Sequence, residues 1–225
     1  MQEKLMFYII LSLSLFTFNV KATEITCYSS VYAPYSFLEN DKPTGIDIDL
    51  ITKIAEKLKL PVSFKIIPWS RLKQLMLVSE IECAAAFLRS PDNEKVMAYM
   101  KTPITTGDYS LFIAENNKNA LLNISDFYGA TIAVNRGFSI PTELKSPISK
   151  GLIKIYEVNS PVQSLQMLST SRVKAALIDK HVGNYYKQKL NIEKITTVEP
   201  PLVSTPVYLV FSKELEENGI YKELV

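Results

Sequence analysis

The sequence predicts an α/β protein of two lobes, each a mostly parallel sheet flanked by helices. Strand-like and helix-like patterns alternate along the chain, which is typical of parallel sheets covered by helices. The same strand–helix–strand plan begins a second time near Asp126. The chain that follows the apolar N-terminal segment also has the length of one large domain or two small lobes.

The first run opens with a strand at 25–31 and a helix at 47–58. In this helix, apolar side chains recur at helical spacing and form one stripe. The stripe consists of Ile48, Ile51, Ile54, Ala55 and Leu58. The elements expected next are a strand at 62–67, a helix at 70–78, a short buried strand at 83–87, a helix at 93–99 and a strand at 110–114.

The second run follows the same order. The elements expected here are a strand at 131–134, a turn at 136–139, a helix that begins at 141–144, a strand at 153–158, a helix through 168, a strand at 175–178, a helix at 183–190 and a late strand at 207–211. Ser160 is a good N-cap for the helix that ends at 168. Segments 103–108 and 198–205 are expected to cross between the lobes. Lobe I then holds residues 23–107 and 200–225, and lobe II holds residues 108–199.

Residues 1–22 are expected to be a signal peptide. Lys4 supplies the charged start, residues 5–20 carry no charge, and Val20-Lys21-Ala22 suits a cleavage site. The alternative is an uncleaved anchor, but the apolar run is shorter than the roughly 20 residues of a membrane span. We therefore expect export to the periplasm with cleavage near Ala22.

Composition argues against several function classes. The net charge of +2 gives no electrostatic reason to bind nucleic acid or an anionic membrane. His181 is the only histidine, so zinc sites and Ser/His/Asp or Cys/His catalysis are poorly supported, and we expect no cofactor and no metal. Cys27 and Cys83 lie in predicted strands that should be neighbours. A disulfide and two buried thiols fit equally well.

Candidate ligand-binding residues stand at the carboxyl ends of the predicted strands, where open α/β sheets bind their ligands. These ends carry Tyr32, Trp69, residues 87–89, residues 136–139 and Asp179. They come from both lobes. A cleft between two hinged lobes suits a small molecule that becomes buried on closure.

Four motifs carry a resemblance to a known family: VYAPYSF at 31–37, GIDIDL at 45–50, PWSR at 68–71 and RSPDNEK at 89–95. In this order they resemble periplasmic (extracellular) solute-binding proteins of family 3, the type that serves polar-amino-acid ABC transporters. The resemblance covers nearly all of the chain after residue 22. It implies the two-lobed type II periplasmic-binding-protein fold with its ligand cleft between the lobes.

The resemblance also implies roles for individual residues. Tyr32 and Trp69 would stack on the ligand, and Asp179 would accept its ammonium. Ser139, in a Gly-x-Ser turn, would donate to its carboxylate. The Arg that grips the carboxylate in the family is missing, because Asn93 stands at its position. Asn lacks the charge and the forked donors of a guanidinium. Either Arg71 or Arg89 reaches in from nearby, or the ligand lacks an α-carboxylate.

Each residue also has a structural alternative. Tyr32 and Trp69 would pack the lobe interior, and Asp179 and Ser139 would cap helices. Arg71 would be a surface residue of its helix. His181 is expected to be a solvated helix residue.

The function that these observations favour is binding of a small polar solute, an amino acid or a similar molecule. The protein would be a monomer, without catalytic activity, that delivers the solute to an inner-membrane ABC permease. Two alternatives remain open: a sensory module that reports to a receptor, and an exported dehydratase-like enzyme on the same fold. The chain ends at Val225, so the final helix usual in the family is expected to be short or absent.

Overall fold

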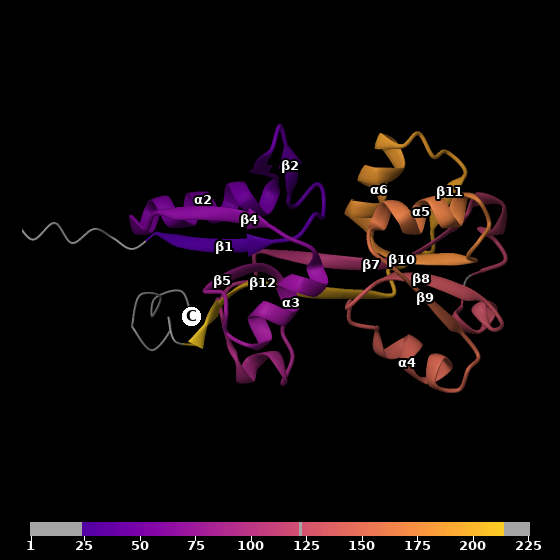
Figure 1. The fold of residues 1–225 in the computed structure, drawn as a ribbon. Coiled ribbons are helices and arrows are strands. Elements are labelled where there is room, and N and C mark those ends of the chain that lie inside the picture. The colour runs from indigo at the N-terminus through magenta and orange to yellow at the C-terminus, as the bar shows by residue number, and fades with distance from the viewer. Residues whose placement is uncertain (1–23, 122, 214–225) are drawn as a thin grey trace, which may run out of the picture.

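The computed structural model describes residues 24–121 and 123–213. They form two α/β lobes that lie side by side along one mixed sheet, as Figure 1 shows. The expected signal peptide at 1–22, its cleavage site at Ala22 and the C-terminal residues 214–225 lie outside the described residues.

Strands of the two lobes lie at opposite ends of the sheet, whose order is β4-β1-β5-β12-β7-β10-β8-β9. The first lobe contributes β1 (Ile25–Ser29), β4 (Val62–Ile66), β5 (Cys83–Leu88) and β6 (Met97–Tyr99), which pairs with β12. The second lobe contributes β8 (Thr131–Asn135), β9 (Lys154–Val158), β10 (Ala175–Asp179) and β11 (Ile195–Thr197), which pairs with β7.

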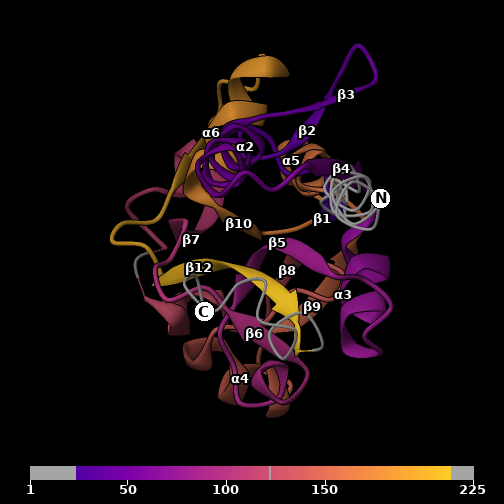
Figure 2. The same ribbon diagram turned by 90° about the vertical axis from the view of Figure 1, so that its left-hand side faces the viewer.

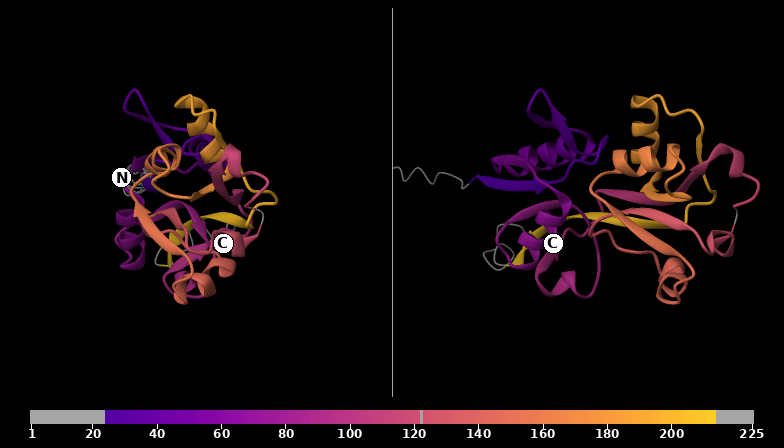
Figure 3. Two further views of the ribbon diagram at one scale, coloured as in Figure 1. Left: turned by 90° about the vertical axis from the view of Figure 1, so that its right-hand side faces the viewer. Right: turned by 45° about the vertical axis from the view of Figure 1, so that its right-hand side comes forward.

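Two long strands, β7 (Thr105–Ala114) and β12 (Val203–Ser212), join the lobes. Residues 105–109 of β7 pair antiparallel with 203–207 of β12, and each strand then continues into a different lobe. The right-hand view of Figure 3 shows these strands running between the lobes. The overlap falls close to the crossings expected at 103–108 and 198–205. The lobe boundaries themselves remain a prediction.

Helices cover both faces of the sheet. In Figures 1 and 2, α2 (Ile46–Leu58), α5 (Pro161–Ser169) and α6 (Lys180–Lys189) lie on one side, and α3 (Trp69–Leu77) and α4 (Thr142–Ser149) lie on the other. The predicted stripe of α2 buries Ile48, Ile51 and Ala55. The Ser160 hydroxyl accepts a hydrogen bond from the Gln163 amide at 3.2 Å, which confirms the predicted N-cap of α5.

The prediction of a helix at 93–99 is wrong. A 3₁₀ turn at Asn93–Lys95 is followed by β6, whose residues Met97–Tyr99 are all buried and pair with residues 210–212 of β12. Pairing with a strand more than a hundred residues away overrides the local pattern. The hairpin of β2 (Phe37–Glu39) and β3 (Lys42–Thr44) was not predicted. Its two-residue turn has positive φ angles at Asn40 and Asp41, as tight hairpins require.

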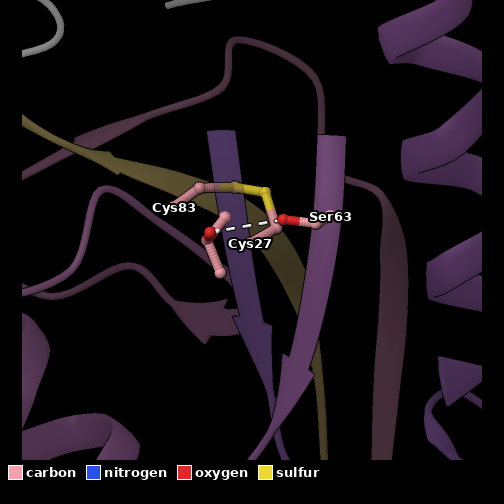
Figure 4. The surroundings of a disulfide bond; sticks show 4 residues. Cys27, Ser63 and Cys83 are labelled. Atoms are coloured by element: carbon pink, nitrogen blue, oxygen red, sulfur yellow. Dashed lines mark hydrogen bonds between the residues drawn. A yellow bond between two sulfur atoms is a disulfide. The ribbon is translucent and has the colours of Figure 1, made fainter. Parts of the chain in front are cut away.

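The structure decides between the two readings of the cysteines. Cys27 of β1 and Cys83 of β5 form a disulfide between neighbouring parallel strands, with their Cα atoms 4.4 Å apart (Figure 4). Ser63 of β4 lies on the other side of β1, where its hydroxyl is 3.3 Å from that of Thr26. Disulfides persist in oxidising compartments, which agrees with the expected export.

Candidate ligand-binding site

A cavity of about 590 Å³ lies at the junction of the lobes. It is lined by residues of the first lobe, of the second lobe and of the overlapping parts of β7 and β12. Its size lies within the range of small-molecule pockets, about 300–1,000 Å³. Binding there would engage both lobes at once.

Five of the seven predicted site residues line this cavity. They are Tyr32, Trp69, Asn93, Ser139 and Asp179. Asn93 is held in its turn by two hydrogen bonds, from its amide to the Ser90 hydroxyl at 3.2 Å and from its side chain to the Leu88 carbonyl at 3.2 Å.

The structure does not bring Arg71 or Arg89 to the cavity. Arg71 is exposed on α3. The guanidinium carbon of Arg89 lies 5.0 Å from the ring centroid of Tyr99 and 4.9 Å from that of Tyr208, and its Nε is 3.5 Å from Glu94. Cation–π contacts and this ion pair therefore hold Arg89 away from the position that the missing Arg would occupy.

Asp179 ends β10 and caps α6, and its side chain also lines the cavity. Its Oδ1 accepts hydrogen bonds from the amides of His181 at 3.0 Å and Val182 at 3.1 Å, and its Oδ2 accepts one from the Asp108 amide at 3.0 Å. Burial raises the pKa of Asp179 above its usual value, and the backbone donors oppose this shift. The capping alternative is thus present in the structure, at a position that also faces the site.

Lys73 is a cavity residue that the sequence analysis missed. It follows Trp69 by four residues on α3, so the two side chains share one face of the helix. Its ammonium donates a hydrogen bond to the Gly137 carbonyl at 3.3 Å, which links the first lobe to the turn after β8. Among the described residues that line the cavity, Lys73 alone is basic. The helical spacing from Trp69 was the signal that could have identified it.

Phe138 is a second residue that was missed. Its ring centroid lies 5.6 Å from that of Tyr32, 5.7 Å from that of Trp69 and 6.4 Å from that of Tyr109, all in edge-to-face geometry. The Tyr32 hydroxyl and the Trp69 indole nitrogen are buried without hydrogen-bond partners. Phe138 thus occupies space beside both predicted stacking rings, which brings the Gly-x-Ser turn against the first lobe.

The turn that carries Tyr32 is held by the start of α2. The amides of Ile46 and Asp47 donate to the carbonyls of Pro34 at 3.1 Å and Tyr35 at 2.9 Å. Gly45 has a φ of 123°, and a Cβ there would collide with the Tyr35 carbonyl. The glycine of the GIDIDL motif is therefore required by the close approach of the two segments.

Asp47 itself lines the cavity and is buried, with only 1% of its surface exposed. Its Oδ1 has no hydrogen-bond partner. Burial raises the pKa of its carboxyl from 3.8 to about 6. Tyr35 lies close by, and burial together with the charge of Asp179 raises the pKa of its phenol to about 12. Tyr35 therefore remains neutral, within electrostatic reach of the carboxylates of Asp47 and Asp179.

Neither a metal centre nor a membrane-spanning helix is found in the part of the chain that the structure describes. Residues 24–121 and 123–213 hold no group of three or more His, Cys, Asp or Glu side chains arranged to bind a metal ion. No helix within the same ranges has both the length and the apolar character needed to cross a bilayer.

Two α/β lobes joined by two crossing strands, with a cavity at their junction, are typical of proteins that bind small molecules. Comparison of sequences identifies the family: the chain belongs to the bacterial extracellular solute-binding proteins, family 3, whose model matches residues 25–218. The resemblance predicted from the four motifs is thereby confirmed.

Two curated relatives are binding proteins. A probable amino-acid ABC transporter-binding protein of Haemophilus influenzae is 26% identical over 162 residues, which cover 71% of this chain and 61% of the relative. The L-cystine-binding protein TcyA of Bacillus subtilis is 26% identical over 163 residues, 71% of this chain and 59% of the relative. The chain thus spans about three fifths of the length of these relatives.

Solved structures share the fold. A histidine kinase sensor domain with similarity to periplasmic binding proteins superposes with a TM-score of 0.78 at 18% identity, over 88% of this chain and 86% of that domain. An ancestral arginine-binding protein bound to arginine gives a TM-score of 0.74 at 19% identity, over 89% and 97% of the two chains. These likenesses confirm the predicted two-lobed fold.

Proposed function

We propose that this protein binds an amino acid, or a similar small polar solute, in the cavity between its lobes and delivers it to an ABC permease. The observation that carries the proposal is a cavity of about 590 Å³ lined from both lobes at the β7–β12 overlap. Membership of the family and the names of the two curated relatives support the same class of ligand.

Within this proposal, the two ends of an amino acid have different partners. Asp179 would accept the α-ammonium, because it is the carboxylate at the end of β10 that faces the cavity. Ser139 and Lys73 would bind the α-carboxylate, since Ser139 precedes α4 and Lys73 already reaches the neighbouring Gly137 carbonyl. Lys73 would thereby supply the positive charge that Asn93 cannot.

The aromatic residues would flank the aliphatic part of the ligand. Tyr32 and Trp69 line the cavity, and Phe138 contacts both rings. Rotation about the two crossing strands would separate the lobes, move Phe138 away from these rings and admit the ligand.

Binding is tested by isothermal titration of the purified chain with the twenty amino acids, followed by chromatography of the recovered ligand. We expect one ligand or a small group to bind stoichiometrically and to return unchanged. Tyr32→Ala should abolish binding. The matched control is Tyr156→Ala, which replaces an exposed tyrosine of β9 and should leave binding unchanged. Conversion of the ligand on incubation would favour the enzyme alternative. If none of the twenty amino acids binds, amino-acid binding is refuted, and a further titration with amines, organic acids and small peptides that also shows no binding would refute the proposal.

We also propose that the protein is exported, cleaved near Ala22 and monomeric. N-terminal sequencing of the periplasmic fraction tests the cleavage, and light scattering tests the monomer. A sensory role would use the same cavity. It differs in its partner: ligand-loaded protein should stimulate ATP hydrolysis by a permease only if transport is the function.

A further inference from the structure

The turn after β8 lies against the first lobe. Its residue Gly137 has a φ of 79°, in the left-handed region that glycine adopts freely, and a Cβ built there would lie 3.5 Å from the indole of Trp69. The carbonyl of Gly137 accepts the hydrogen bond of the Lys73 ammonium at 3.3 Å. Trp69 and Lys73 are four residues apart on α3, so they lie on one face of that helix. The turn of the second lobe is therefore packed on this face of α3.

Phe138, the next residue of this turn, contacts the two rings that are proposed to flank the ligand. Its ring centroid lies 5.6 Å from that of Tyr32 and 5.7 Å from that of Trp69, edge-to-face in both cases. All three rings line the cavity. Ring contacts form at centroid distances of about 4.5–7 Å, so Phe138 already lies where a partner of these rings would lie. A ligand that stacks on Tyr32 and Trp69 therefore needs space that Phe138 fills.

A second set of contacts holds the lobes in this arrangement. Tyr35, in the turn after β1, is buried in one apolar cluster with Tyr186 of α6. Phe37 of β2 and Tyr185 of α6 pack against the same cluster, with their ring centroids 6.1 Å apart. Side chains of the protein alone make these contacts. They therefore favour the closed arrangement, in which Phe138 lies on the two rings, before a ligand enters.

We propose that Phe138 is an internal competitor of the ligand: it occupies the ring surfaces of Tyr32 and Trp69 in the closed lobes, and a bound amino acid takes its place there. The inference rests on the proposed function, since it concerns the rings that would flank the same amino acid. The ligand must replace the two contacts that Phe138 gives up, so Phe138 lowers the affinity of the site. Two ring contacts of ordinary strength correspond to about tenfold in affinity.

The test is titration of the full chain with each of the twenty amino acids, for wild type and three variants. Phe138→Ala should bind the same amino acid as wild type about tenfold more tightly, because the ligand no longer displaces a ring. Phe138→Leu keeps much of the apolar volume and therefore loses less packing, but it lacks the ring contacts, so it should also bind more tightly than wild type.

The matched control is Phe37→Ala. This change also removes a ring contact between the lobes, the one with Tyr185, but Phe37 is not among the described residues that line the cavity. The control should not tighten binding, because Phe37 does not lie on the rings that the ligand would use.

The outcomes separate this inference from the proposed function. Unchanged or weaker binding by either Phe138 variant that keeps the cooperative thermal transition of wild type overturns the inference. Equal tightening by Phe138→Ala and Phe37→Ala also overturns it, because loosening of the lobes would then be the cause. Both results leave amino-acid binding intact. Failure of all twenty amino acids to bind wild type and variants alike refutes amino-acid binding itself, and the inference with it.

Discussion

Asp47→Asn should stabilise the protein at pH 8 when no ligand is present. The native fold raises the pKa of Asp47 from 3.8 to about 6, and each unit of difference corresponds to about 1.4 kcal/mol. The burial penalty on the charged carboxylate is therefore about 3 kcal/mol. The Asn amide that replaces the carboxyl is buried at a place where Oδ1 of Asp47 has no hydrogen-bond partner, which costs about 1 kcal/mol. A gain of about 2 kcal/mol in the free energy of unfolding is expected.

The gain should depend on pH, because the native carboxyl holds its proton more tightly than the unfolded one. Between pH 4 and pH 6 the native state binds more protons, so stability falls as the pH rises through this window. The penalty is complete above about pH 6 and nearly absent at pH 4. Asn does not ionise, so the variant should be more stable than wild type at pH 8 and similar to it at pH 4.

Urea denaturation followed by the fluorescence of Trp69, the only tryptophan, provides the assay. Midpoints are compared at pH 4 and pH 8 for wild type, Asp47→Asn and the exposed control Asp49→Asn. The control should shift stability by less than about 0.5 kcal/mol at both pH values. A destabilised Asp47→Asn variant at pH 8, or an equal effect at both pH values, would refute the reasoning that Asp47 is ionised and uncompensated.

Three further changes have defined outcomes. Phe138→Ala removes three ring contacts that each contribute about 0.5–1.5 kcal/mol, so it should lower stability by about 1.5–4.5 kcal/mol. It should also shift the Trp69 emission to the red, and an unchanged spectrum would contradict the contact between the two rings. Replacing Cys27 and Cys83 together by Ala removes a disulfide that closes a loop of sequence separation 56, and this should lower the free energy of unfolding by about 4 kcal/mol. A reductant should then lower the thermal midpoint of wild type but not of the variant. Lys73→Met should weaken amino-acid binding about tenfold or more while Lys73→Arg retains it, and equal losses in both would argue against a role for the charge.

Local patterns predicted most of the fold because they depend on neighbouring residues alone. The apolar stripe of α2 and the Ser160 cap of α5 are confirmed, since helical spacing and capping involve residues only a few positions apart. The same reasoning failed at 93–99, where Met97–Tyr99 extends along β12. A segment of only three residues adopts the extended backbone that pairing with the distant strand β12 requires.

The site was predicted less completely than the fold. The ends of strands and the four motifs indicated Tyr32, Trp69 and Asp179, and the cavity brings these three together. Arg89 was expected to be able to reach inward, but two tyrosines from β6 and β12 hold its guanidinium. Those rings come from strands that no local pattern places beside Arg89.

The sequence by itself determined the class of fold and the family, and it indicated strand ends that border the cavity. Tertiary structure decided which charged side chains line the cavity: Lys73 lines it, Arg71 and Arg89 do not, and Asp47 is buried in its wall with an Oδ1 that has no hydrogen-bond partner. It also decided that Cys27 and Cys83 are joined. The physical reason is that the spacing of apolar residues depends only on the backbone conformation of a short segment. The burial and the partners of a side chain are instead set by strands and turns that meet only when the whole sheet assembles.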